Sequence, residues 1–82
     1  MHIMKIAIKL WGNIAYHSQE ARGRFALTKS VEEGTTVQQL VQELRLPRNL
    51  NYIITVNGRT VESEYFLKDG DEVALYSPFS GG

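Results

Sequence analysis

One amphipathic segment limits the folds that this chain can adopt. Thr36 suits a helix N-cap, and Gln39 stands three residues later, which is the spacing of a capping box. Apolar residues then recur at the i, i+3, i+4 and i+7 positions of one helix face: Val37, Leu40, Val41 and Leu44. Leu46-Pro47 predicts the end of the helix, because the residue before a proline is disfavoured in the helical region. With one main helix of about three turns, the core must form between that helix and a sheet.

The remaining sequence has the features of strands and turns. Strands are predicted where apolar and polar residues alternate or β-branched residues cluster, at residues 4–10, 52–56, 59–61 and 73–76. A further strand is predicted from Arg24 onward, and Glu33-Gly34-Thr35 breaks it. Asn57-Gly58 favours a hairpin, Asp69-Gly70-Asp71 a tight turn, and Pro78 the end of the last strand. Residues 12–23 lack a period and predict a long connection with a short helix at residues 13–17. This order predicts an α+β fold, with a mixed sheet of about five strands and one main helix on one face.

Alternation along the strands also predicts which side chains the helix leaves uncovered. The sheet face opposite the helix is expected to hold Lys5, Ala7, Lys9, Thr55, Ala74 and Tyr76. This face is available to solvent or to a partner, and Tyr76 is the strongest candidate for a partner contact. Trp11 follows the first strand, and its position fits either a cap on the core or a place in an interface.

Composition excludes several classes of function. The 82 residues carry nine Lys and Arg against nine Asp and Glu, which removes the electrostatic reason to propose a nucleic-acid or anionic-membrane partner. The absence of Cys excludes a disulfide framework, a thiolate nucleophile and a Cys-ligated zinc site. His2 and His17 have no visible carboxylate or nucleophile partner, so neither a catalytic residue nor a metal ligand is predicted. No apolar run is long enough for a signal peptide or a membrane span, and we expect a cytoplasmic protein.

Charge is nevertheless unevenly distributed along the chain. Residues 1–29 carry five basic side chains and one acidic one, whereas residues 61–82 carry one basic and five acidic side chains. Neighbouring strands with complementary charges would explain this split. The alternative is an acidic patch that docks on a basic partner surface.

The C-terminal residues have no predicted structural role. We expect residues 1–76 to form the domain and residues 77–82 to form a flexible tail, because Ser80-Gly81-Gly82 has nothing to bury. Without Cβ atoms, Gly81 and Gly82 can enter a narrow channel and adopt backbone angles that other residues avoid. The tail would thus present a bare carboxylate to the active site of another protein.

These features together resemble a known group of proteins. The segment Leu67-Lys68-Asp69-Gly70-Asp71-Glu72-Val73, followed by the ending Pro78-Phe79-Ser80-Gly81-Gly82, resembles the β-grasp, ubiquitin-like sulfur carriers of the MoaD/ThiS family. The length and the long connection are most similar to the small subunit of molybdopterin synthase. Lys9 stands at an outward position where that subfamily commonly has an apolar residue.

The resemblance implies a function for the tail. Gly82 would be adenylated with ATP by a ubiquitin-activating-type enzyme and then converted to a thiocarboxylate, while Pro78, Phe79, Ser80 and Gly81 pass through the partner's site. The chain itself would be neither an enzyme nor a binder of a cofactor. Its partners would be the adenylating enzyme and a molybdopterin synthase large subunit, docked against an interface that includes Ala7, Lys9, Thr55 and Tyr76.

Other functions remain open at this stage. The sulfur could serve thiamine, cysteine or tungsten-cofactor synthesis instead of the molybdenum cofactor. The chain could also be a ubiquitin-like modifier that is conjugated to lysines, or a non-covalent interaction module. The sequence leaves open the oligomeric state and the role of Trp11 and of residues 12–24.

Overall fold

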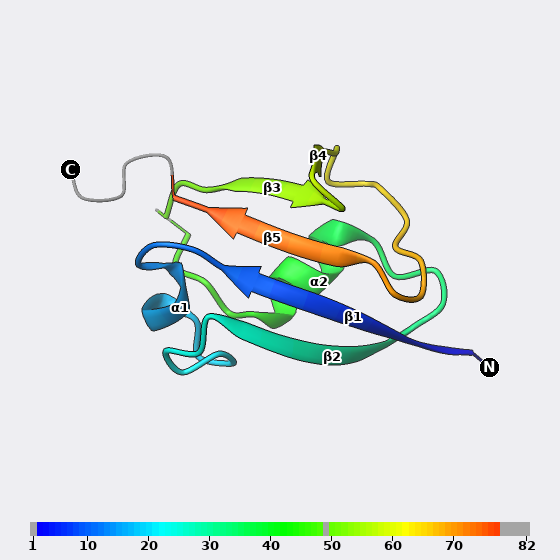
Figure 1. Cartoon of the computed structure of the whole chain (residues 1–82), viewed down its shortest axis with the longest axis horizontal. Coiled ribbons are helices and arrows are strands. Elements are labelled where there is room, and N and C mark those ends of the chain that lie inside the picture. Colours follow the sequence, from blue (N-terminus) through cyan, green and yellow to red (C-terminus); the bar gives the residue numbers. More distant parts are fainter. Residues whose placement is uncertain (1, 49, 78–82) are drawn as a thin grey trace.

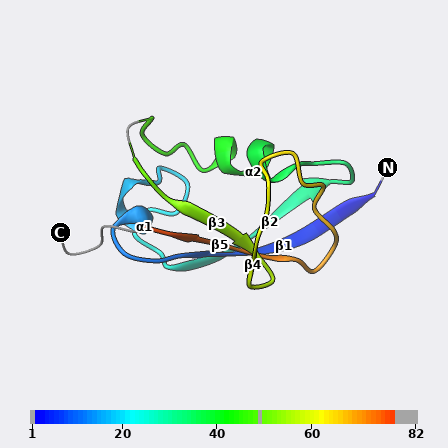
Figure 2. The ribbon, with the colours of Figure 1, turned by 90° about the horizontal axis from the view of Figure 1, so that it is seen from above.

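A five-stranded mixed sheet, covered on one face by the main helix, forms the fold (Figures 1 and 2). The computed structural model describes residues 2–48 and 50–77. The elements in chain order are β1 (Ile3–Leu10), α1 (Ile14–His17), β2 (Ala26–Glu32), α2 (Val37–Glu43), β3 (Ile53–Val56), β4 (Arg59–Thr60) and β5 (Glu72–Tyr76). The strand order is β2-β1-β5-β3-β4, with β1 and β5 parallel and every other neighbouring pair antiparallel. The predicted α+β class is confirmed, and the arrangement is the ubiquitin-like β-grasp.

The core lies between α2 and one face of the sheet. Along β1 the burial alternates, so Met4, Ile6, Ile8 and Leu10 face the core. Val37, Leu40 and Val41 of α2 pack against this layer, together with Val73 and Leu75 of β5. The predicted apolar stripe of the helix is therefore its buried face.

The ends of α2 combine one confirmed feature with one correction. At the N-terminus the capping box is present: the Gln39 backbone N–H donates to the Thr36 hydroxyl, and the Gln39 side-chain oxygen accepts from the Thr36 N–H. The helix was predicted to run to Leu46-Pro47, but it ends at Glu43 after about two turns. The chain leaves the helical path at Arg45, whose φ of +54° is the left-handed conformation typical of a helix C-terminus.

Other boundaries also differ from the prediction, and those of β1, β3, β4 and β5 differ by one residue at one end. The second strand was expected to begin at Arg24 and to be broken by Glu33-Gly34-Thr35. It begins two residues later, at Ala26, and ends as predicted at Glu32, where it pairs with Ile3 of β1. The short helix predicted at residues 13–17 is α1, which begins one residue later with Asn13 as its N-cap. The Asn57-Gly58 hairpin is confirmed, and both residues have the positive φ that a type I′ turn requires.

Candidate functional site

The sheet face opposite α2 carries an exposed apolar patch where β5 ends. Its members are Trp11, Ile53 and Tyr76, with 50%, 45% and 39% of their surface exposed, and we call them the exit patch. The backbone N–H of Trp11 donates to the Leu75 carbonyl oxygen at 2.9 Å, which fixes the tryptophan beside β5. The Trp11 and Tyr76 rings are nearly parallel, at 4°, with centroids 6.5 Å apart. Ile53 pairs with Tyr76 across β3 and β5, so the patch spans three neighbouring segments.

Small side chains form the floor next to the exit patch. Ala74 of β5 pairs with Lys9 of β1 on one side and with Thr55 of β3 on the other. Ala74 and Thr55 are only 5% and 8% exposed, although they lie on the face away from the helix. The Thr55 hydroxyl is buried without a hydrogen-bond partner among the described residues. A buried hydroxyl without a partner lowers the free energy of unfolding, so stability alone does not account for a threonine at this position.

The four predicted interface residues share this face but differ in accessibility. Tyr76 belongs to the exit patch, whereas Thr55 lies in its floor. Ala7 and Lys9 are half-buried on β1, and Lys9 forms an ion pair with Glu72 at 3.3 Å. An exposed pair of this kind contributes about 0–1 kcal/mol to the free energy of unfolding. It lies beside the exit patch and adds little to the stability of the domain. Whether any of these residues contacts a partner stays a prediction.

Sequence reasoning left two members of the exit patch unassigned. Ile53 is two residues from Thr55 on the same strand, so strand alternation was the signal that could have found it. Trp11 lies beyond the end of β1, and its hydrogen bond to Leu75 and its stacking on Tyr76 show that it stays on the sheet. The predicted tail residues Pro78, Phe79, Ser80, Gly81 and Gly82 lie outside the described residues.

The aspartate turn before β5 has a structural role. Asp71 is 6% exposed, and its carboxylate accepts hydrogen bonds from the Asn57 side-chain amide at 2.9 Å and from the Lys68 N–H at 2.8 Å. The side-chain oxygen of Asn57 in turn accepts a hydrogen bond from the Glu72 N–H at 3.0 Å. Asp69 is exposed and accepts one bond from the Lys5 N–H at 2.8 Å. The turn thus fixes the start of β5 against β1 and the β3–β4 hairpin, and sets the direction in which the chain leaves the sheet.

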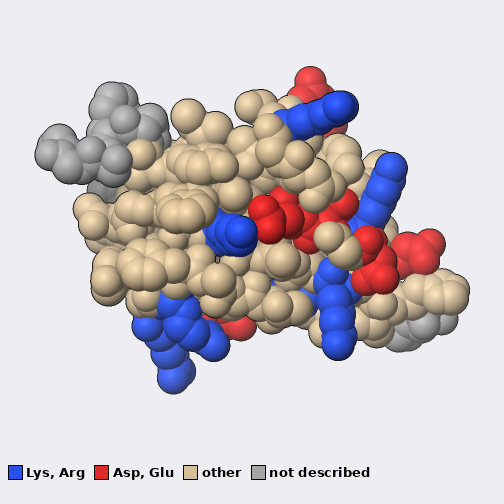
Figure 3. Space-filling model, in the orientation of Figure 1, with Lys and Arg blue, Asp and Glu red and all other residues tan. Residues whose placement is uncertain are grey.

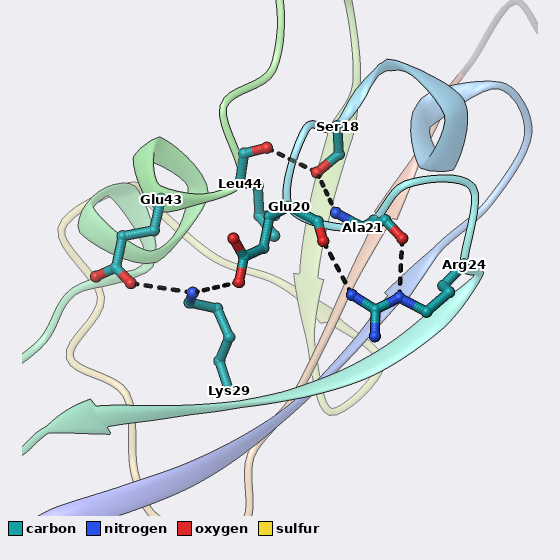
Figure 4. Close-up of polar contacts among 7 residues, drawn as sticks. All are labelled: Ser18, Glu20, Ala21, Arg24, Lys29, Glu43 and Leu44. Carbon is teal, nitrogen blue, oxygen red and sulfur yellow. Dashed lines mark hydrogen bonds and ion pairs between the residues drawn. The ribbon is translucent and has the colours of Figure 1, made fainter.

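The long connection between β1 and β2 is fastened to the end of α2 (Figure 4). The Ser18 hydroxyl donates to the Leu44 carbonyl oxygen at 2.6 Å and accepts from the Ala21 N–H at 3.1 Å. The connection also contributes to the core, because Ile14, Ala15 and Ala21 are fully buried. This fastening holds Trp11, at the start of the connection, close to the rigid body of the domain.

A second fastening is electrostatic. The Lys29 ammonium on β2 lies 3.0 Å from a Glu20 carboxylate oxygen and 3.4 Å from a Glu43 carboxylate oxygen (Figure 4). The hydrogen bond from Lys29, and then its charge, hold the pKa of Glu20 below its ordinary value. Burial alone lowers the pKa of Lys29, but the hydrogen bonds and charges of Glu20 and Glu43 outweigh burial and raise it.

Residues 2–48 and 50–77 hold no group of three or more His, Cys, Asp or Glu side chains placed to bind a metal ion. Within the same part of the chain, no helix is long and apolar enough to cross a membrane.

Comparison with known structures identifies close counterparts of the fold. A protein of Pyrococcus furiosus assigned as subunit 1 of molybdopterin converting factor is 25% identical, with a TM-score of 0.75 over 92% of this chain and 98% of the other. Small archaeal modifier protein 1 of H. volcanii is 20% identical, with a TM-score of 0.73 and the same coverage of each chain.

A complex of subunits 1 and 2 of molybdopterin-converting factor from Helicobacter pylori also matches. That chain is 21% identical, with a TM-score of 0.57, and the match covers 96% of this chain and 100% of the other. A search of curated protein sequences finds no match.

The sequence itself matches a family model. The model of the ThiS family matches residues 17–82, which is most of the chain and includes both terminal glycines. Members of this family are small ubiquitin-like carrier proteins that act together with partner proteins. By this match, and with a fold shared by ubiquitin-like sulfur carriers and modifiers, the chain belongs to the ThiS family.

Proposed function

We propose that this protein is a sulfur carrier whose terminal Gly82 carboxylate is activated and converted to a thiocarboxylate. The observation that carries the proposal is the match to the ThiS family, because it extends through Gly82. A carboxylate oxygen of Gly82 would attack the α-phosphorus of ATP, forming an acyl adenylate and releasing pyrophosphate. Sulfide supplied by the activating system would then attack the acyl carbon and displace AMP, which leaves the thiocarboxylate on Gly82.

The chain's own contribution to this chemistry is presentation. The adenylating enzyme would bind ATP and supply the acid–base groups, so the carrier needs no cofactor of its own. The carrier would place Gly81 and Gly82 in a narrow active site, while the segment from Pro78 to Ser80 passes through the entrance. We propose that the carrier meets this enzyme in the cytoplasm.

The exit patch is the surface on which we expect the adenylating enzyme to dock. It combines Trp11, Ile53 and Tyr76, each at least 39% exposed, and Tyr76 is the last residue of β5. Trp and Tyr are the residue types that most often dominate binding energy at protein interfaces. A partner that covers the patch would therefore hold the domain while the tail enters its active site.

For the acceptor of the sulfur, we propose a molybdopterin synthase large subunit and synthesis of the molybdenum cofactor. The Pyrococcus furiosus protein assigned as subunit 1 of molybdopterin converting factor supports this assignment at 25% identity. The Helicobacter pylori counterpart is seen in a complex with subunit 2. A carrier for thiamine, cysteine or tungsten-cofactor synthesis would use the same activation with a different acceptor.

A second candidate function is protein modification. The similarity to small archaeal modifier protein 1 favours it, because a fold of this kind is found in a protein named as a modifier. In that case the activated Gly82 would form an isopeptide bond with a lysine. Recovery of the chain from its native cells covalently attached to other proteins through Gly82 would support this candidate over sulfur transfer.

Pyrophosphate exchange tests the proposed activation. The purified protein, incubated with ATP, labelled pyrophosphate and its cognate activating enzyme, should support exchange of label into ATP. Deletion of Gly82 should abolish exchange and leave the unfolding midpoint unchanged. Exchange that persists after this deletion would contradict the proposal, as would a wild-type protein that supports none.

A further inference from the structure

Fixed positive charge lies at the margin of the exit patch. The hydrogen bond from the Leu10 N–H to the Phe25 carbonyl oxygen, at 2.8 Å, extends the β1–β2 ladder by one residue beyond the Lys9–Ala26 pair. Trp11 follows Leu10 and Arg24 precedes Phe25, so this hydrogen bond places Arg24 near Trp11 at the end of the β1–β2 pair. Figure 3 shows a group of Lys and Arg side chains at the lower left of this face, with some Asp or Glu beside it, whereas most Asp and Glu side chains, together with further Lys and Arg, lie in the centre and on the right.

The Arg24 guanidinium is held in place by backbone atoms and not by a carboxylate. Its Nε donates to the Ala21 carbonyl oxygen at 2.9 Å, and its Nη2 donates to the Glu20 carbonyl oxygen at 3.0 Å (Figure 4). A guanidinium has five N–H donors, so these two bonds leave three free. Because the side chain is already ordered, binding through it would lose little conformational entropy.

The charge of Arg24 is not neutralised by the carboxylates nearby. The three ion pairs among the described residues involve Lys9 or Lys29 and leave Arg24 out. The Glu20 carboxylate is engaged by Lys29, which also contacts Glu43. Arg22 and Arg45 add further positive charge around this connection, and Arg45, like Arg24, lowers the pKa of Glu20 through its charge. The neighbourhood therefore has an excess of positive charge.

We propose that Arg24 binds an acidic side chain, Asp or Glu, on the adenylating enzyme that receives the C-terminal tail. The inference rests on the proposed function, since it concerns the partner that docks at the exit patch. Interfaces commonly surround an apolar centre with polar contacts at the rim, and Arg24 has that position relative to Trp11. A guanidinium can bind a carboxylate through two parallel N–H bonds, which provides orientation as well as affinity. Arg24 would thus fix the rotation of the carrier on its partner and increase the association rate.

Steady-state exchange kinetics at two salt concentrations test this role. Replacement Arg24→Gln should raise the KM for the carrier about tenfold at 0.05 M salt with kcat unchanged. The difference should shrink to about threefold or less at about 0.5 M salt, because ions screen the interaction. Arg24→Lys should give an intermediate KM, since it keeps the charge and loses the two-pronged geometry.

A matched control separates this role from others. Arg59 is an exposed arginine on β4, at the other edge of the sheet. It takes part in none of the three ion pairs of the described residues. Arg59→Gln should therefore change the KM for the carrier by less than about twofold. Three results would overturn the inference: an unchanged KM for Arg24→Gln, an equal rise at both salt concentrations, or a rise in the KM for ATP instead of the carrier. The last result would indicate a phosphate as the ligand. Failure of the wild-type protein to support exchange would instead contradict the proposed function.

Discussion

Asp69 and Asp71 stand two residues apart in one turn, yet their replacement should have very different effects on stability. Asp71 is 6% exposed and accepts two hydrogen bonds, from the Asn57 amide and the Lys68 N–H. In Asp71→Ala both donors lose a charged acceptor in a partly buried setting, at about 1.5 kcal/mol each. The free energy of unfolding should therefore fall by about 3 kcal/mol, a large share of what a domain of this size possesses.

The matched control is Asp69→Ala. Asp69 is exposed and accepts one hydrogen bond, from the Lys5 N–H, which water can replace. Its loss should cost at most about 1 kcal/mol.

Urea unfolding, followed by far-ultraviolet circular dichroism, measures both changes. At about 4–8 °C per kcal/mol for a domain of this size, Asp71→Ala should also lower the melting temperature by at least about 12 °C. Equal losses for the two variants, or a loss below about 1 kcal/mol for Asp71→Ala, would refute the assignment of Asp71 as the residue that anchors the start of β5.

Three further predictions concern the exit patch, the Lys29 contacts and the buried hydroxyl. Trp11→Ala should raise the KM for the carrier in pyrophosphate exchange by at least about tenfold, as expected of an interface centre. Phe66→Ala, an exposed aromatic outside the patch, should leave that KM unchanged.

Because the pKa of Glu20 is lowered in the folded state, its contribution is present at neutral pH and disappears as the pH falls through the folded value. The stability difference between wild type and Glu20→Gln should therefore shrink as the pH falls from neutral, and an equal difference at neutral and acid pH in urea unfolding would contradict the Lys29 pairing. Thr55→Val replaces a hydroxyl that has no partner among the described residues by a methyl group, so it should stabilise the protein by up to about 1 kcal/mol in urea unfolding. Destabilisation would show that the hydroxyl has a partner.

Local patterns were sufficient to predict the elements whose cause is local. The capping box at Thr36, the apolar stripe of α2 and the Asn57-Gly58 hairpin each depend on residues within a few positions of one another, and all three are present. The strand alternation of β1 likewise predicted its buried and exposed faces.

The features that sequence reasoning missed depend on contacts between distant segments. The helix ends early because Arg45 adopts a left-handed conformation, and the Ser18 hydroxyl, in the connection between β1 and β2, donates a hydrogen bond to the Leu44 carbonyl oxygen. The position of Trp11 depends on a hydrogen bond to Leu75, which is 64 residues away in the chain. No local pattern encodes either contact, so neither the helix end nor the full exit patch could be predicted.

The intact mass of the protein purified from its native cells tests the central claim most directly. The account predicts a fraction of molecules in which one oxygen of the Gly82 carboxylate is replaced by sulfur, with the mass difference confined to the C-terminal fragment. Treatment with a thiol-reactive alkylating reagent should modify only that fraction, because the chain has no Cys. A C-terminus that carries only the ordinary carboxylate, in cells that are actively using the sulfur pathway, would contradict the account.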